Sequence, residues 1–214
     1  MPDGQYSFYL HSDDRTDIAA MATISTISQP LRGEFIRTAA TAGAVVYQVD
    51  ARLPALIPVF FAGQLSAVRL CAVMALVSGT WSSLTGLPDE PENGEAALPV
   101  SPETEYQRRR YTLTLQNGRS GERVESVLTE ASSRLRGDLL RNLIITGLAL
   151  HTTAPELPRL LASMPVPPTS VSELQALVQQ MAGTADVNRA AAAVPDTPAA
   201  SAAPVSGADT REIK

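Results

Sequence analysis

The chain of 214 residues has little of the chemistry that metal sites and catalytic triads need. It contains one cysteine, Cys71, and two histidines, His11 and His151. One cysteine excludes a disulfide framework and a multi-thiolate site, and two histidines leave little for zinc or a histidine-based triad. No GxxxxGK[ST], HExxH, CxxC or GxSxG motif is present. We therefore expect no enzymatic activity, no metal site and no cofactor.

Long apolar runs and targeting signals are also lacking. The longest charge-free apolar stretch, residues 53–68, has 16 residues and contains two prolines, so it is too short to span a membrane. The N-terminal segment MPDGQYSFYL lacks the basic start and the apolar run of a signal peptide. We therefore expect a cytoplasmic protein that does not enter a membrane.

The net charge of −5 is unevenly distributed along the chain. Residues 81–105 hold six acidic residues and no basic residue, and their Pro, Glu and Gly content is typical of a solvated linker. Residues 184–214 are mostly Ala, Pro, Ser, Thr and Asp, which predicts a disordered tail. Two compact segments remain: a first at 1–80 and a second, more basic one at 106–183.

These two segments are repeats of each other. Residues 30–57 and 134–161 align without a gap at an offset of 104, and eight of 28 positions are identical where chance gives about two. The identical pairs are Leu31/Leu135, Arg32/Arg136, Gly33/Gly137, Arg37/Arg141, Gly43/Gly147, Leu53/Leu157, Pro54/Pro158 and Leu56/Leu160. Upstream, YSFYLH at 6–11 aligns with YTLTLQ at 111–116. We infer an internal duplication.

Each repeat is predicted to begin with one short strand and to continue with about four helices. Alternation places Tyr6, Phe8 and Leu10 on one face of the first strand. Helical spacing predicts helices near 14–27, 31–48, 53–62 and 64–79, and near 120–132, 134–152, 156–163 and 170–182. Asp13–Asp14 and Ser120–Gly121 are the predicted caps of the first helix in each repeat, and Pro54 and Pro158 suit a first helical turn. The acidic cluster Asp13, Asp14 and Asp17 fits the charge preference of a helix start.

A lone strand needs a partner for its backbone N–H and C=O groups, and no second strand is evident in either repeat. We therefore predict that the two strands pair with each other as an antiparallel ribbon packed on the helices. This is the ribbon–helix–helix architecture. The predicted fold class is mainly α, with tandem units forming an intramolecular pseudo-dimer.

The outer face of such a ribbon fits the major groove of DNA. Outer-face side chains that can contact bases or phosphates are Gln5, Ser7, Tyr9 and His11 in the first strand and Arg110, Thr112, Thr114 and Gln116 in the second. Arg32 and Arg136 begin the second helix of each repeat, where free N–H groups favour a phosphate. Arg108, Arg109 and Arg119 would add electrostatic contacts. An ordinary exposed strand with solvated arginines has a similar pattern, so the prediction depends on the duplication and the missing strand partner.

The second repeat resembles the ParR/StbB plasmid partition adaptors. The resemblance lies in RRRYTLTLQNGRSGERVESVLTEASSRLRGDLLRNLIITGLALHTTAPELPRLLASMP. Its features are a basic pair before the strand, the polar segment 136–141, the segment 147–150 and the proline-bearing segment 155–161. The first repeat matches the same pattern with fewer basic residues, through YSFYL, RGEFIRTAA and GAVVYQ. Family members usually carry one unit per chain and dimerise, whereas this chain carries two.

The resemblance implies a plasmid segregation protein. Such an adaptor binds centromere-like repeats in double-stranded DNA, represses its own operon and engages an actin-like ATPase through a flexible C-terminus. Here Arg211, Ile213 and Lys214 are the corresponding tail candidates. The fusion of two units puts in doubt whether the DNA site is palindromic, and self-association on DNA stays open. The alternatives are a relaxosome accessory protein or repressor of the same fold, and a helical protein–protein interaction module without DNA binding.

Overall fold

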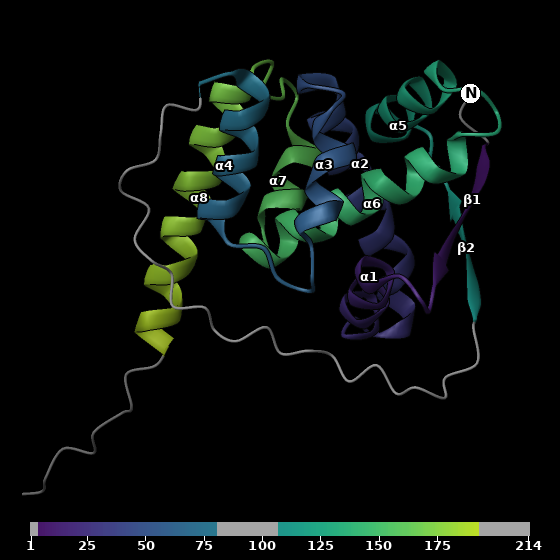
Figure 1. The fold of residues 1–214 in the computed structure, drawn as a ribbon, viewed down its shortest axis with the longest axis horizontal. Helices are drawn as coiled ribbons and strands as arrows, with labels where there is room; N and C mark the ends of the chain where they lie inside the picture. Colours follow the sequence, from purple (N-terminus) through teal and green to yellow (C-terminus); the bar gives the residue numbers. More distant parts are fainter. Residues whose placement is uncertain (1–3, 81–106, 193–214) are drawn as a thin grey trace, which may run out of the picture.

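The structure is a computed structural model, and it describes residues 4–80 and 107–192, with side chains to Gly183 (Figure 1). The first repeat contains β1 (Gln5–His11), α1 (Arg15–Ser25), α2 (Gln29–Val49), α3 (Leu53–Phe60) and α4 (Ala67–Ser78). The second contains β2 (Arg108–Thr114), α5 (Arg119–Glu130), α6 (Arg136–Thr153), α7 (Leu157–Ser163) and α8 (Val171–Ala192). The predicted fold class, a mainly helical tandem of strand-plus-helices units, is confirmed.

The two strands pair with each other within one chain. They form an antiparallel ribbon whose register runs from Gln5 opposite Thr114 to His11 opposite Arg108. Ser7 lies opposite Thr112, and these two residues occupy equivalent positions of the repeat. The pseudo-two-fold axis of the duplicated unit therefore passes through this pair, at the middle of the ribbon.

Beneath the ribbon, α2 and α6 cross and form the centre of the core. The ribbon buries Phe8, Leu10 and Leu113 against the helices. A Cβ on Gly43 would overlap the backbone of Leu143, and a Cβ on Gly147 would overlap that of Ala39. These two contacts are related by the offset of 104. The glycines shared by the repeats therefore allow two helix backbones to meet closely at the pseudo-two-fold axis.

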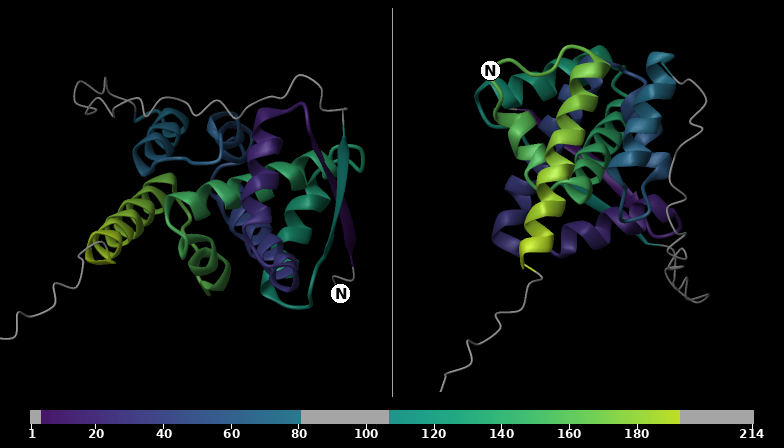
Figure 2. Two further views of the ribbon diagram at one scale, coloured as in Figure 1. Left: turned by 90° about the horizontal axis from the view of Figure 1, so that it is seen from below. Right: turned by 90° about the vertical axis from the view of Figure 1, so that its left-hand side faces the viewer.

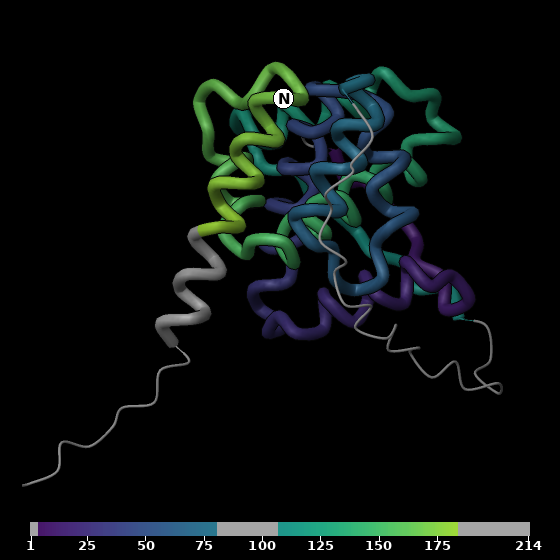
Figure 3. The backbone as a smooth tube through the Cα atoms, turned by 60° about the vertical axis from the view of Figure 1, so that its left-hand side comes forward, coloured from purple at the N-terminus to yellow at the C-terminus, as the bar shows by residue number. Residues whose placement is uncertain are grey.

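The two repeats interdigitate into one hydrophobic core rather than forming separate globules. α3 of the first repeat packs on α6 of the second, and α7 of the second packs on α2 of the first. The Thr153 hydroxyl donates to the Leu65 carbonyl across the repeats at 2.7 Å. Figure 3 shows the resulting interleaving of the blue and green parts of the backbone.

α4 and α8 pack against each other at the end of the molecule opposite the ribbon (Figures 1 and 2). Cys71 of α4 is buried on the side of the helix that faces α8. Within residues 4–80 and 107–192, no helix is both long and apolar enough to cross a bilayer.

Side-chain hydrogen bonds repeat with the same offset as the sequence. Thr16 Oγ1 donates to the Pro58 carbonyl at 3.1 Å, and Ser120 Oγ donates to the Ala162 carbonyl at 3.3 Å. In each repeat, the bond joins the start of the first helix to the last turn of the third helix. The duplication therefore extends from the sequence to individual contacts.

Several boundaries differ from the prediction. Ser120 does not cap α5, because Gly118 is the N-cap residue and Ser120 lies inside the helix, whereas Asp14 caps α1 as predicted. β2 begins at Arg108 and ends at Thr114, so Gln116 lies beyond the strand. α8 continues to Ala192, into the segment predicted to be disordered, because alanine has the highest helix propensity. Residues 193–214, with Arg211, Ile213 and Lys214, lie outside the described residues.

Candidate nucleic-acid interface

The outer face of the ribbon gathers most of the predicted contact residues. Gln5, Ser7, Tyr9 and His11 of β1 alternate with the buried Phe8 and Leu10, and Arg108, Arg110, Thr112 and Thr114 project from β2 on the same face. The β2 members are exposed, whereas Ser7, Tyr9 and His11 are half-buried. The more basic strand therefore stands further out into solvent.

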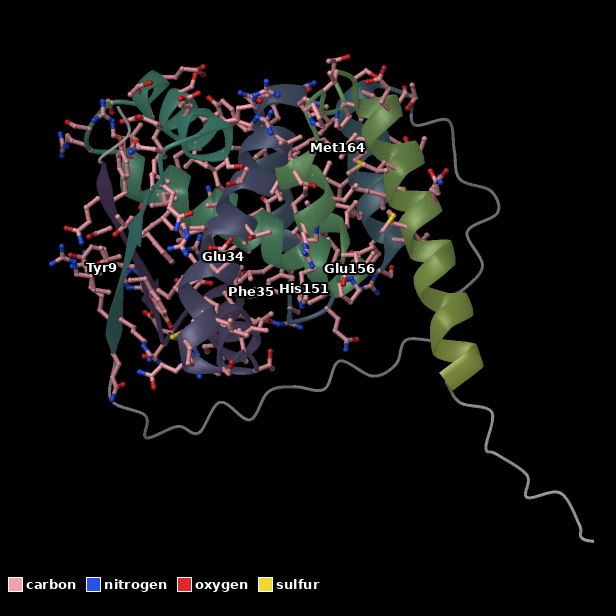
Figure 4. All side chains as sticks on the ribbon, turned by 180° about the vertical axis from the view of Figure 1, so that it is seen from behind. Tyr9, Glu34, Phe35, His151, Glu156 and Met164 are labelled. Carbon is pink, nitrogen blue, oxygen red and sulfur yellow. The ribbon has the colours of Figure 1, made fainter. Side chains whose placement is uncertain are left out.

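Cross-strand contacts order two of the arginines on this face. The Arg110 guanidinium donates to Ser7 Oγ from Nε at 3.2 Å and from Nη2 at 2.9 Å. Arg108 lies over the Tyr9 ring, with Cζ 3.6 Å from the ring centroid. Tyr9 is at the edge of the molecule in Figure 4, on the far side from α8. Both cations are thus held above the ribbon without a carboxylate partner among the described residues.

Arg109 differs from its two neighbours. Its register position is opposite the buried Leu10, on the inner face, but its side chain is exposed and lies 5.4 Å from the Tyr111 ring centroid. Tyr111 stacks on Phe8 with 5.2 Å between ring centroids. Burial raises the pKa of Tyr111, so its hydroxyl is neutral at physiological pH. Arg109 therefore flanks the ribbon instead of sharing the face with Arg108 and Arg110.

Arg32 and Arg136 have an intramolecular role that the sequence did not indicate. Arg32 Nε donates to the Ile27 carbonyl at 2.8 Å, and Arg136 Nε donates to the Ala131 carbonyl at 3.2 Å. Each arginine thus fastens the turn that joins the first two helices of its repeat. Arg32 Nη2 also donates to the Ser25 carbonyl at 3.3 Å, so both arginines, at the start of α2 and α6, already make contacts within the chain.

Carboxylates border the ribbon on one side. A depression beside β1 is lined by the outer-face residues Ser7, Tyr9 and His11 together with Asp13, Asp14, Asp17 and Asp138 and with Arg108, Arg134 and Arg141. Because these four aspartates offset the charge of the three arginines, the uncompensated positive charge of the ribbon is concentrated on β2.

Asp17 and Arg141 form an ion pair that sequence reasoning missed. Arg141 Nε donates to Asp17 Oδ1 at 2.7 Å, and the His11 N–H donates to Asp17 Oδ2 at 2.9 Å. The Asp17 side chain is 1% exposed. Burial raises the pKa of Asp17, and the His11 N–H and the Arg141 guanidinium, which lower it, offset only part of that rise. Asp14 caps α1 and lies 3.3 Å from Arg141, so two of the three clustered aspartates bind this arginine.

Comparison with known proteins identifies a family. The family model described as plasmid stability protein matches the chain twice, at residues 4–74 and 109–178. These two regions correspond to the two repeats. No curated protein and no solved structure matches the chain.

Proposed function

The chain belongs to the plasmid stability protein family, and from this premise we propose that it acts by binding double-stranded DNA through the outer face of the β1–β2 ribbon. The observation that carries the proposal is the exposed β2 row Arg108, Arg110, Thr112 and Thr114. Arginine can bond a guanine edge or a phosphate, and threonine can donate, accept or contact a thymine methyl. A two-stranded ribbon of this size fits a major groove.

The two strands offer different groups to the DNA. β2 presents two ordered arginines, whereas β1 presents Ser7, Tyr9 and His11, which are closer to neutral. We propose that one chain reads an asymmetric site, with the β2 half supplying most of the electrostatic affinity.

Fluorescence anisotropy with DNA from upstream of the gene, and a scrambled duplex as control, tests this function between about 50 and 300 mM salt. We expect tighter binding to the upstream DNA and a steep loss of affinity with salt. Arg110→Gln removes one charge and should reduce the salt slope by about 0.9. Arg69→Gln on α4, at the far end of the molecule, is the matched control and should leave binding unchanged.

Absence of binding at the lowest salt would favour a helical protein–protein module. Equal affinity for both duplexes would remove the sequence-specific reading and leave only non-specific attraction.

We further propose the partition role that the resemblance implies: binding of centromere-like repeats, repression of the chain's own operon and engagement of an actin-like ATPase through the tail. Co-sedimentation of the full chain with filaments of an ATPase encoded beside it tests the last step. The double variant Arg211→Ala, Ile213→Ala should no longer bind the filament and should still bind DNA. An adjacent relaxase gene instead of an ATPase gene would point to the conjugation role.

A further inference from the structure

The internal two-fold symmetry is broken at one pair of arginines. Arg37 of α2 and Arg141 of α6 occupy equivalent positions of the repeat. Arg141 is neutralised by Asp14 and Asp17 of the other repeat. At the offset of 104 these aspartates correspond to Gly118 and Gly121, so the two equivalent positions of α5 offer Arg37 no carboxylate.

The equivalence of these positions is fixed by the structure and not only by the alignment. Asp14 and Gly118 are the N-cap residues of α1 and α5. The neighbouring pair Thr16 and Ser120 make the same side-chain bond to the end of the third helix of their repeat. Gly121 packs against Gln116, as Asp17 packs against His11. The missing carboxylates are therefore a true difference between the halves.

A cavity of about 320 Å³ lies beside Gly118 and Gly121, between α2, α5 and α7. Three arginines line it, Arg37, Arg119 and Arg159, with a single acidic residue, Glu34. Arg37 bonds to Glu34 of its own helix, and Glu34 is 63% exposed. Glu34, which lines the cavity, is labelled on α2 in Figure 4. Arg119 and Arg159 form no hydrogen bond or ion pair within residues 4–80 and 107–192, so a positive excess remains.

The start of α5 adds donors to this cavity. In α1 the Asp14 carboxylate accepts the N–H of Asp17 at 2.9 Å. In α5 Gly118 has no side chain to accept the equivalent N–H of Gly121, and no side chain caps the helix. Free N–H groups at a helix start and guanidinium groups are both suited to a phosphate.

We propose that the α2–α5–α7 cavity is a phosphate-binding site, in which a bound phosphate group supplies the negative charge that the Asp14 and Asp17 carboxylates supply in the other half. Arg37, Arg119 and Arg159 bind its oxygens, and the N–H of Gly121 donates a further bond. The cavity is at the small end of the range for ligand pockets, which suits a single phosphate group. The cavity lies apart from the exposed β2 row, because Arg108, Arg110 and Thr112 do not line it, although Gln116 and Arg119, predicted above as DNA contacts, do.

Inorganic phosphate is the probe. Thermal unfolding of the full chain is followed as phosphate replaces chloride at constant ionic strength, and isothermal titration gives the affinity. We expect a saturable rise in the unfolding temperature, because a ligand held only by the folded state stabilises it. Arg159→Gln and Arg37→Gln should each weaken phosphate binding by about tenfold or more, and Arg159→Lys should retain part of it. Arg134→Gln, an exposed arginine beside the opposite depression, is the matched control and should bind as the parent does.

Two sources of phosphate are distinguished in the same experiment. Competition between phosphate and a short duplex, with loss of duplex affinity in Arg159→Gln, would assign the site to the DNA backbone. Phosphate binding with unchanged duplex affinity would assign it to a free phosphate ligand. No saturable response to either, or an equal loss of binding in Arg134→Gln, would overturn the proposal. A protein that binds phosphate here and no DNA would keep this site and remove the proposed function.

Discussion

At the residue scale, the identical arginines of the repeat differ in what they contribute to stability. Arg141→Ala leaves Asp17 buried without its partner, which costs about 3–5 kcal/mol for a fully buried pair. Because the Arg141 side chain is 21% exposed, we expect a smaller loss of about 2–3 kcal/mol. Arg37→Ala removes only a contact with an exposed glutamate, so its cost should stay below about 1 kcal/mol. Urea unfolding followed by far-ultraviolet circular dichroism measures both, through midpoints at unchanged m.

Equal losses of unfolding free energy in Arg141→Ala and Arg37→Ala would contradict the pairing of Arg141 with the buried Asp17.

The sequence showed that both arginines are kept in the repeat, but it could not show the partner, because Asp17 and Arg141 are 124 positions apart and belong to different repeats. Asp13, Asp14 and Asp17 were predicted to mark a helix start, and α1 does begin there, with Asp14 at the N-cap and Asp17 in the first turn, but the pairing of Asp17 with Arg141 was not predicted. The outer-face residues could be predicted because a strand with one buried face alternates with a period of two.

At the scale of elements, the crossing of α2 and α6 depends on its two glycines. Gly147→Ala places a Cβ on the backbone of Ala39 and forces the helices apart, so we expect a loss of about 1–3 kcal/mol. Gly33→Ala is the control within α2. The nearest atom to its Cβ would be Arg37 Nη1 at 3.7 Å, and alanine should be neutral or stabilise by up to about 1 kcal/mol. Thermal and urea unfolding of the two variants compares them directly, and a Gly147→Ala protein as stable as the parent would refute the close crossing.

All eight predicted helices exist, but their ends were harder to place. Apolar spacing identifies a helix over several turns, whereas its last residue depends on caps and on neighbours. Gly118 is the N-cap residue of α5 and has a φ of 130°. Ser120 was predicted as the cap because serine is a common N-cap residue. The start of β2 was fixed by its partner, since His11 pairs with Arg108 and extends the strand into the arginine run. A single strand viewed alone carries no information on that register.

At the scale of the whole molecule, the missing strand partner correctly predicted an intramolecular ribbon. The sequence could not predict that α3 packs on α6 of the second repeat and α7 on α2 of the first, because an apolar helix face does not specify which helix covers it. Because of this packing between repeats, the two repeats share one core, in which residues such as Ile57, Leu65, Leu143 and Leu161 are fully or almost fully buried. Neither repeat then has a complete core of its own.

A cut between the repeats tests this joint core. A protease site placed within residues 81–105, outside the described segments, separates the chain into two halves without altering the ribbon or the helices. Because β1 pairs with β2 and α2 crosses α6, the cut halves should stay together and elute as one species with the mass of the intact 22.7 kDa chain. Folding of the cut protein becomes bimolecular, so its unfolding temperature should rise with protein concentration, while that of the uncut chain stays constant. Halves that separate and remain individually folded would show two independent domains. An uncut chain whose unfolding temperature already depends on concentration would show that the ribbon forms between chains.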